Sequence, residues 1–208
     1  MNIEDFKKAL EFIKANESII IHRHSNPDGD ALGSQVGLLH IIKENYPEKS
    51  VYIVGDESER YGFIPNRIMD TVDDSLFPSS LSIILDTSSP SLISDQRWRN
   101  AKESLRFDHH LFIEKIADYE VVDSTYESSC GLIADFAKTL GLKVNDKAAK
   151  ALYTGMVTDS GRFLYDSVSS RTHTIAAFLL ERSFDRNDIF RNLYVEDLES
   201  VKRKLSFM

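Results

Sequence analysis

The chain has 208 residues, which is enough for one large domain or one domain with an appendage. Of these residues, 42% are hydrophobic and 28% are charged, as in ordinary globular proteins. Its net charge of −8 disfavours binding to long duplex nucleic acid, and no apolar run approaches the roughly 20 residues that cross a bilayer. Because Cys130 is the single cysteine and the N-terminus lacks a signal segment, we expect a cytoplasmic protein.

Strands and helices alternate over the first 125 residues. The hydrophobic pattern predicts helices over 3–13, 30–45 and 91–103, strands over 18–22, 51–54, 81–85, 105–107 and 119–122, and a mobile loop over 55–65. This alternation is typical of right-handed crossovers and a parallel sheet. We therefore predict an α/β fold with a parallel sheet of roughly five strands, flanked by helices, with the first helix on the sheet edge.

The C-terminal third is predicted to be mostly helical. The expected helices cover 129–140, 146–157, 172–182 and 188 to about 206, with a short extended piece at 163–165. The last helix is charged and ends without a cap. We interpret residues 1–185 as one domain and residues 186–208 as a connector helix towards a further domain.

A strand-to-helix loop carries the densest set of ligand side chains. His24, Asp28 and Asp30 follow the apolar strand 18–22, in the sequence His-Ser-Asn-Pro-Asp-Gly-Asp. In open α/β sheets, ligands bind at the carboxyl ends of strands, where this loop is expected. One imidazole and two carboxylates suit a divalent cation.

Other predicted strands end in similar groups. Asp86 follows strand 81–85, Asp108-His109-His110 follow strand 105–107, and Asp159 follows a helix in Thr158-Asp159-Ser160-Gly161. The candidate metal ligands are thus His24, Asp28, Asp30, Asp86, His109 and Asp159. Four carboxylates suit two ions roughly 3.5–4 Å apart, bridged by a carboxylate and a water that becomes hydroxide and attacks phosphorus. Mixed carboxylate and imidazole ligation without sulfur favours Mn²⁺.

Three further residues complete the predicted site. We expect His110 to hydrogen-bond a phosphoryl oxygen or the leaving group, and Asp108 to orient His109 through its other ring nitrogen. Arg162 follows the last motif and is expected either to neutralise a phosphate in bidentate fashion or to pair with a nearby carboxylate.

These motifs, in this order, resemble the four motifs of the DHH phosphoesterase superfamily. The sequences around Asp28 and Asp159 are most similar to the branch of nanoRNases and phosphatases of 3′-phosphoadenosine 5′-phosphate. The resemblance implies that His24, Asp28 and Asp86 hold one Mn²⁺, and that Asp30, Asp86, His109 and Asp159 hold the other. It implies short single-stranded RNA, degraded from the 3′ end, or a mononucleotide as substrate. Members of the branch also carry a C-terminal substrate-binding domain with a Gly-rich basic motif, which this sequence lacks.

Simpler interpretations exist for each motif alone. Asp28 suits a turn, Asp86 a helix cap, and Ser128 or Ser129 the cap of the next helix rather than a phosphate contact. The aromatics of residues 61–63 suit either base stacking or cover of the sheet edge.

Other functions also fit the same chemistry. They are hydrolysis of linear or cyclic dinucleotides, single-stranded DNA or pyrophosphate, and an inactive metal-binding fragment or sensing module. A homodimer is a further expectation.

Overall fold

The computed structural model describes residues 2–65 and 68–194. Its centre is a five-stranded sheet in the order β2-β1-β3-β4-β5, in which every neighbouring pair is parallel. The strands are β1 (Ser18–His22), β2 (Ser50–Ile53), β3 (Leu81–Leu85), β4 (Glu103–Asp108) and β5 (Tyr119–Val122). This confirms the predicted fold class. Because β1, β3 and β4 are adjacent, their carboxyl ends meet at one edge of the sheet.

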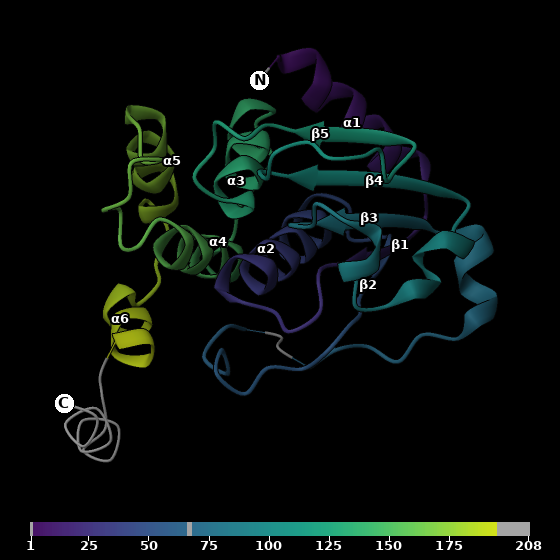
Figure 1. Ribbon diagram of the computed structural model, residues 1–208, viewed down its shortest axis with the longest axis horizontal. Helices are drawn as coiled ribbons and strands as arrows, with labels where there is room; N and C mark the ends of the chain where they lie inside the picture. Colours follow the sequence, from purple (N-terminus) through teal and green to yellow (C-terminus); the bar gives the residue numbers. More distant parts are fainter. Residues whose placement is uncertain (1, 66–67, 195–208) are drawn as a thin grey trace.

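Helices cover one face of the sheet in layers, as Figure 1 shows. They are α1 (Ile3–Ala15), α2 (Gly29–Asn45), α3 (Ser129–Thr139), α4 (Asp146–Asp159), α5 (Ser170–Leu180) and α6 (Arg186–Tyr194). α4 packs on α2 and α3, and α5 packs outside α3 and α4. No helix in the described part of the chain is both long and apolar enough to pass through a bilayer.

The central strands β1 and β3 are buried on both faces, as expected for a parallel sheet. Ile19 and Ile21 belong to the main core beneath the helices, whereas Ile20 packs with Val54 and Phe77 on the opposite face. Short 3-10 helices cover that opposite face: η1 (Asp74–Ser79), η2 (Pro90–Leu92) and η3 (Gln96–Asn100). The predicted flanking helices therefore lie mainly on one side.

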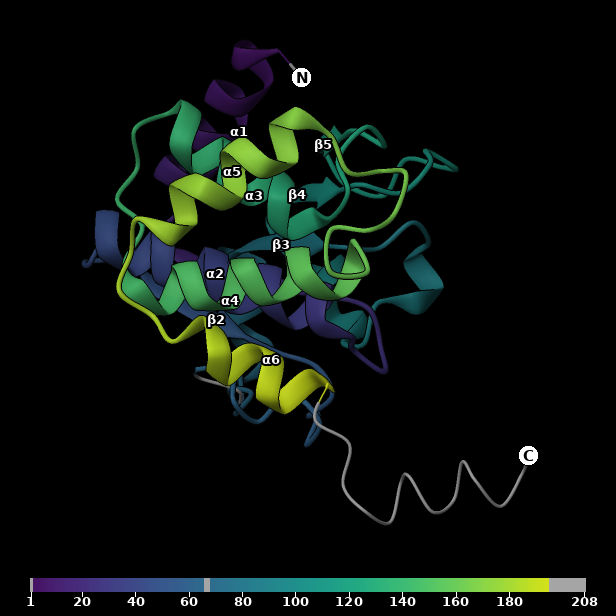
Figure 2. The same cartoon turned by 90° about the vertical axis from the view of Figure 1, so that its left-hand side faces the viewer.

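A row of glycines on α2 brings α4 unusually close, and Figure 2 shows the two helices side by side. A Cβ atom built on Gly33 would lie 2.5 Å from the Ala151 carbonyl oxygen, which cannot move without moving α4. Gly29 and Gly37 would clash with α4 side chains in the same way. The spacing of four residues places all three glycines on one face of α2. As a result, the C-terminal end of α4 reaches the N-terminal end of α2.

The prediction of a helix over 91–103 was wrong. The segment forms η2 and η3, and β4 already begins at Glu103. Ile93, between the two turns, pairs with His24 in an antiparallel bridge, and the Asp95 side chain caps η3. A continuous helix would lose the bridge that supports the His24 loop.

The predicted extended piece at 163–165 was also wrong, because this segment is a tight turn. Arg162 and Phe163 have φ angles of +65° and +64°, and the amides of Leu164 and Tyr165 both donate to the Ser160 carbonyl. This hydrogen-bonded turn follows directly from the end of α4.

The prediction for the first helix is confirmed, whereas only part of the last predicted helix lies in the described residues. α1 lies on the sheet edge, as predicted, with the Tyr119 hydroxyl of β5 3.2 Å from Asp5 Oδ1. Of the last predicted helix, the structure describes α6, whose Ile189 is buried in the main core, and the remainder of that prediction lies outside the described residues. In the 55–65 loop, Tyr61 and Ile64 are buried in the core, so this segment covers the sheet edge.

Candidate metal centre and the adjoining pocket

The first ligand group forms where β1 ends and α2 begins. Asp28 is the N-cap of α2, and its Oδ1 accepts hydrogen bonds from the amides of Asp30 and Ala31 at 2.9 Å. His24 Nε2 lies 3.8 Å from Asp28 Oδ1 and 3.5 Å from Asp86 Oδ2. The two carboxylates raise the pKa of His24 to about 10. These three side chains offer ligand atoms within 4.8 Å of one another.

The N-terminus of α3 holds two of the carboxylates. The Asp30 oxygens accept hydrogen bonds from the Ser129 and Cys130 amides at 2.7 and 2.9 Å. The Ser129 hydroxyl donates to Asp86 Oδ1 at 3.1 Å. Ser128 is the N-cap of this helix, which confirms the prediction that one of the two serines caps it. Ser129 therefore contacts a candidate ligand, which the sequence did not reveal.

The second group joins α2, α4 and the end of β4. His109 Nε2 lies 3.4 Å from Asp159 Oδ2, 3.5 Å from Asp86 Oδ1 and 3.8 Å from Asp30 Oδ2. Burial and the repulsion from Asp86 and Asp159 raise the pKa of Asp30 well above its usual value. Burial, followed by the charges of Asp86 and Asp28, raises the pKa of Asp159 to about 6. The carboxylates of Asp30, Asp86 and Asp159 therefore repel one another strongly in this site.

The donor set fits divalent cations. The six predicted ligands make up two groups, His24–Asp28–Asp86 and Asp30–His109–Asp159, and Asp86 lies against both. A third group in the described part of the chain, Asp86–His109–His110, joins these two and adds His110. A pocket of about 190 Å³ opens onto five of the six side chains. Oxygen and imidazole nitrogen donors suit hard or borderline divalent ions, and such an ion would neutralise the repelling carboxylates.

One predicted contact was wrong: Asp108 orients His110, not His109. Asp108 Oδ1 lies 2.7 Å from His110 Nδ1, whereas His109 Nδ1 faces the Tyr126 carbonyl at 3.4 Å. The reason is the pleat of β4, which places Asp108 on the same face as Arg106, and the buried guanidinium pairs with its carboxylate. The hydrogen bond that His110 Nδ1 donates to Asp108 raises the pKa of His110.

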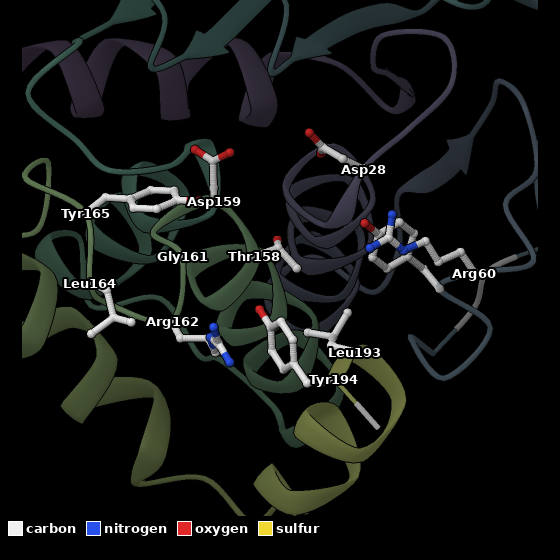
Figure 3. Close-up of a pocket in the computed structure, with 11 residues that line it drawn as sticks. Asp28, Arg60, Thr158, Asp159, Gly161, Arg162, Leu164, Tyr165, Leu193 and Tyr194 are labelled. Atoms are coloured by element: carbon white, nitrogen blue, oxygen red, sulfur yellow. The ribbon is translucent and has the colours of Figure 1, made fainter. Parts of the chain in front are cut away.

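Arg162 lies outside the two ligand groups, in a second pocket beside them. This pocket has a volume of about 360 Å³ and shares Asp28 and Asp159 with the metal centre (Figure 3). The Arg162 guanidinium stacks on the Tyr194 ring at 4.6 Å from its centroid. The expected carboxylate pair of Arg162 is absent among the described residues. Tyr194 and Arg60, which also line this pocket, were not predicted as site residues.

Comparison with known families decides what kind of site this is. The sequence model described as "DHH family, N-terminal domain" matches residues 18–156. The chain belongs to the DHH family. The prediction of a family of phosphoester hydrolases, which depend on metal ions, is thereby confirmed.

Two bacterial proteins are similar to this chain over most of its length. A probable bifunctional oligoribonuclease and PAP phosphatase of Streptococcus mutans is 42% identical over 180 residues, which cover 86% of this chain and 57% of the relative. The bifunctional oligoribonuclease and PAP phosphatase of Bacillus subtilis is 35% identical, over 93% of this chain and 62% of the relative. The chain thus spans about 60% of the length of these relatives.

Solved structures confirm the fold. An exopolyphosphatase-related protein of Bacteroides fragilis superposes with a TM-score of 0.86 over 98% of this chain and 64% of the other, at 23% sequence identity. A putative family II inorganic pyrophosphatase of Methanococcus jannaschii gives a TM-score of 0.57 at 18% identity, over 78% of this chain and 54% of the other. At these identities the likeness concerns the fold alone.

Proposed function

We propose that this chain hydrolyses phosphoester bonds in short oligoribonucleotides, from their 3′ end, and in 3′-phosphoadenosine 5′-phosphate. The names of the relatives at 42% and 35% identity support this substrate class. The observation that carries the proposal is the convergence of six ligand side chains from β1, α2, β3, β4 and α4 on one place.

We further propose that the two ligand groups hold two divalent ions, and that these ions are Mn²⁺. His24, Asp28 and Asp86 would hold one ion, while Asp30, Asp86, His109 and Asp159 would hold the other, so Asp86 would bridge them. When bound, two such ions lower the pKa of a shared water and neutralise the charge of a phosphoryl group. The protein positions its ligands beforehand, through the amides of α3 on Asp30 and the Ser129 hydroxyl on Asp86.

His110 is the proposed proton donor. Asp108 engages its Nδ1 and favours the protonated ring, so Nε2 is available to hydrogen-bond a phosphoryl oxygen or to protonate the leaving oxygen. Arg106 holds Asp108 in place and, with His110, keeps the pKa of this buried carboxyl low.

The rest of the molecule bears on substrate size. With a net charge of −8, the surface favours small anionic substrates held at a local site over long duplex nucleic acid. We propose residues 1–185 as the hydrolase domain and residues 186–208 as the segment leading towards a separate substrate-binding domain. The described part of this segment, α6, packs on the hydrolase domain through the buried Ile189.

The experiment compares the purified chain with its Asp86→Ala variant in Mn²⁺. Both are incubated with a short RNA, 3′-phosphoadenosine 5′-phosphate, pyrophosphate and a cyclic dinucleotide, and Mn²⁺ binding is measured by calorimetry. We expect wild type to cleave the first two substrates, to bind about two ions, and to lose activity with a chelator. Full activity of Asp86→Ala, or cleavage of pyrophosphate alone, would contradict the proposal.

A further inference from the structure

The pocket beside the metal centre combines opposite charges on its walls. Figure 3 shows Asp28 and Asp159, which belong to the metal centre, on one side, and the guanidinium groups of Arg60 and Arg162 further away from them. In residues 2–65 and 68–194, neither arginine pairs with a carboxylate, although acidic residues outnumber basic ones by 33 to 25 in the chain. Because neither guanidinium has a carboxylate partner among these residues, the positive charge of this pocket favours binding of an anionic ligand.

Aromatic rings support both guanidinium groups. Arg162 stacks on Tyr194 at 4.6 Å, and Arg60 lies 5.4 Å from the centroid of Tyr61, which is itself buried. A guanidinium on a ring keeps its N–H groups free at the edge, where they can form two parallel hydrogen bonds to a phosphate. Burial raises the pKa of Tyr194, and the positive charges of Arg162 and Arg60 both oppose this rise, so the two guanidinium groups act on the same tyrosine.

The position of Arg162 relative to the metal centre is set by the backbone. Asp159 ends α4, and the following turn is held by hydrogen bonds from the Arg162 amide to the Val157 carbonyl at 2.8 Å and from the Leu164 amide to the Ser160 carbonyl at 3.0 Å. Because only this short hydrogen-bonded turn separates the metal ligand from the arginine, their separation is constrained. A substrate group bound by Arg162 therefore has a defined offset from the reacting phosphate.

We infer that Arg60 and Arg162 form a subsite for a second, non-reacting phosphate of the substrate. This inference rests on the proposed function, because it assumes that the reacting phosphate occupies the metal centre. The ligand class is a nucleotide with two phosphoryl groups, such as a nucleoside 3′,5′-bisphosphate or a 5′-phosphorylated oligonucleotide. The pocket then selects substrates that carry the second phosphate over otherwise identical substrates that lack it.

The test uses two substrates with the same scissile bond. Adenosine 3′-phosphate differs from 3′-phosphoadenosine 5′-phosphate by the 5′-phosphate alone. We expect Arg162→Gln and Arg60→Gln each to lower kcat/KM for the bisphosphate about 10- to 100-fold, mainly through KM, and to leave kcat/KM for adenosine 3′-phosphate unchanged within about twofold. Arg162→Lys, which keeps the charge and loses the planar fork, should give an intermediate value.

Arg99→Gln is the matched control, because Arg99 is exposed and lines neither pocket. This substitution changes the net charge of the protein by the same amount as Arg60→Gln or Arg162→Gln. Arg99→Gln should not alter the ratio of kcat/KM between the bisphosphate and adenosine 3′-phosphate. Equal kcat/KM of wild type for the two substrates, or equal losses for both substrates in the Arg60 and Arg162 variants, would overturn the inference while leaving the proposed hydrolysis intact.

A binding measurement separates this inference from the proposed activity. Calorimetric titration of wild type without divalent ions, so that no metal ion competes for the phosphate, with adenosine 5′-phosphate and with adenosine should show at least about tenfold tighter binding of the phosphorylated compound, lost in Arg162→Gln. This result would support the subsite even if neither bisphosphate nor RNA were hydrolysed. Unchanged binding of adenosine 5′-phosphate by both arginine variants would overturn it.

Discussion

The metal centre draws its ligands from two regions that are built differently. His24, Asp86 and His109 come just after β1, β3 and β4, where parallel pairing brings strand ends together. Asp28 and Asp30 follow the end of β1, in the cap and first turn of α2. Asp159, at the end of α4, reaches the same place only because α4 packs closely on α2. The first set depends on sheet register and the second on the distance between two helices. Changes in the two regions should therefore have different consequences.

Removal of the Asp86 carboxylate, which lies against both ligand groups, should have the largest effect. We expect Asp86→Ala to lower kcat for 3′-phosphoadenosine 5′-phosphate by about a thousandfold or more, because several kcal/mol of electrostatic stabilisation are lost. The measurement is steady-state phosphate release at saturating Mn²⁺, with circular dichroism to verify folding. A variant that retained a tenth of the activity would argue against a shared carboxylate.

Closing the glycine contact should disturb the ligands on α2 and α4 without replacing any ligand side chain. A Cβ at Gly155 would lie 2.2 Å from Cys130 Sγ and 2.8 Å from Asp30 Oδ1. We expect Gly155→Ala to reduce the free energy of unfolding by about 1–3 kcal/mol, as overpacking does, and to weaken Mn²⁺ binding. Urea denaturation and calorimetry measure the two effects.

The Cys130→Ala/Gly155→Ala double variant is the control for this contact. It removes the sulfur atom that the new methyl group meets, so the double variant should be more stable than the sum of the two single changes predicts. Strict additivity of the two changes would mean that the contact does not limit the approach of α4.

Loss of the Ser129 hydroxyl should have a moderate effect on the strand-borne set. This hydroxyl donates to Asp86 Oδ1, so Ser129→Ala leaves the carboxylate in place but less well oriented. Groups that orient metal ligands typically contribute about 10- to 100-fold in affinity, and we expect a loss in this range for Mn²⁺. Ser128→Ala is the comparison, because it removes the helix cap and should mainly lower stability, by about 1 kcal/mol. The reverse pattern would mean that Ser129 acts only on folding.

The smallest effect is expected at the contact between α4 and α6. Lys150 Nζ lies 2.7 Å from Asp188 Oδ2 in a partly buried pair, with side-chain exposures of 18% and 31%. Lys150→Gln should lower the free energy of unfolding by at most about 1 kcal/mol, while Lys7→Gln, in a more exposed pair with Glu4, should change it hardly at all. Thermal denaturation compares the two. Equal losses would show that burial does not distinguish them.

Much of the sheet and of the strand-end site was predictable from the sequence. The predicted strands, three to five residues long, match all five strands of the sheet, and an acidic or imidazole side chain shortly after three of them pointed to a common edge. The errors lie where local patterns compete with long-range contacts. Residues 91–103 do not form a continuous helix, because Ile93 pairs with His24 in a bridge. Residues 163–165 form a turn, which is stabilised by hydrogen bonds to the Ser160 carbonyl.

The sequence by itself determined the ligand chemistry and its family: the order of the His, Asp and Gly residues sufficed, because ligand type and motif spacing are properties of the chain. Only the tertiary structure decided how these side chains are held and what lies beside them. Asp108 contacts His110, Ser129 supports Asp86, and Arg162 rests on Tyr194 in the adjoining pocket. These contacts join elements distant in sequence or depend on which way a backbone turns. They follow from strand pleat, helix approach and backbone turns, which a linear pattern of residues does not specify.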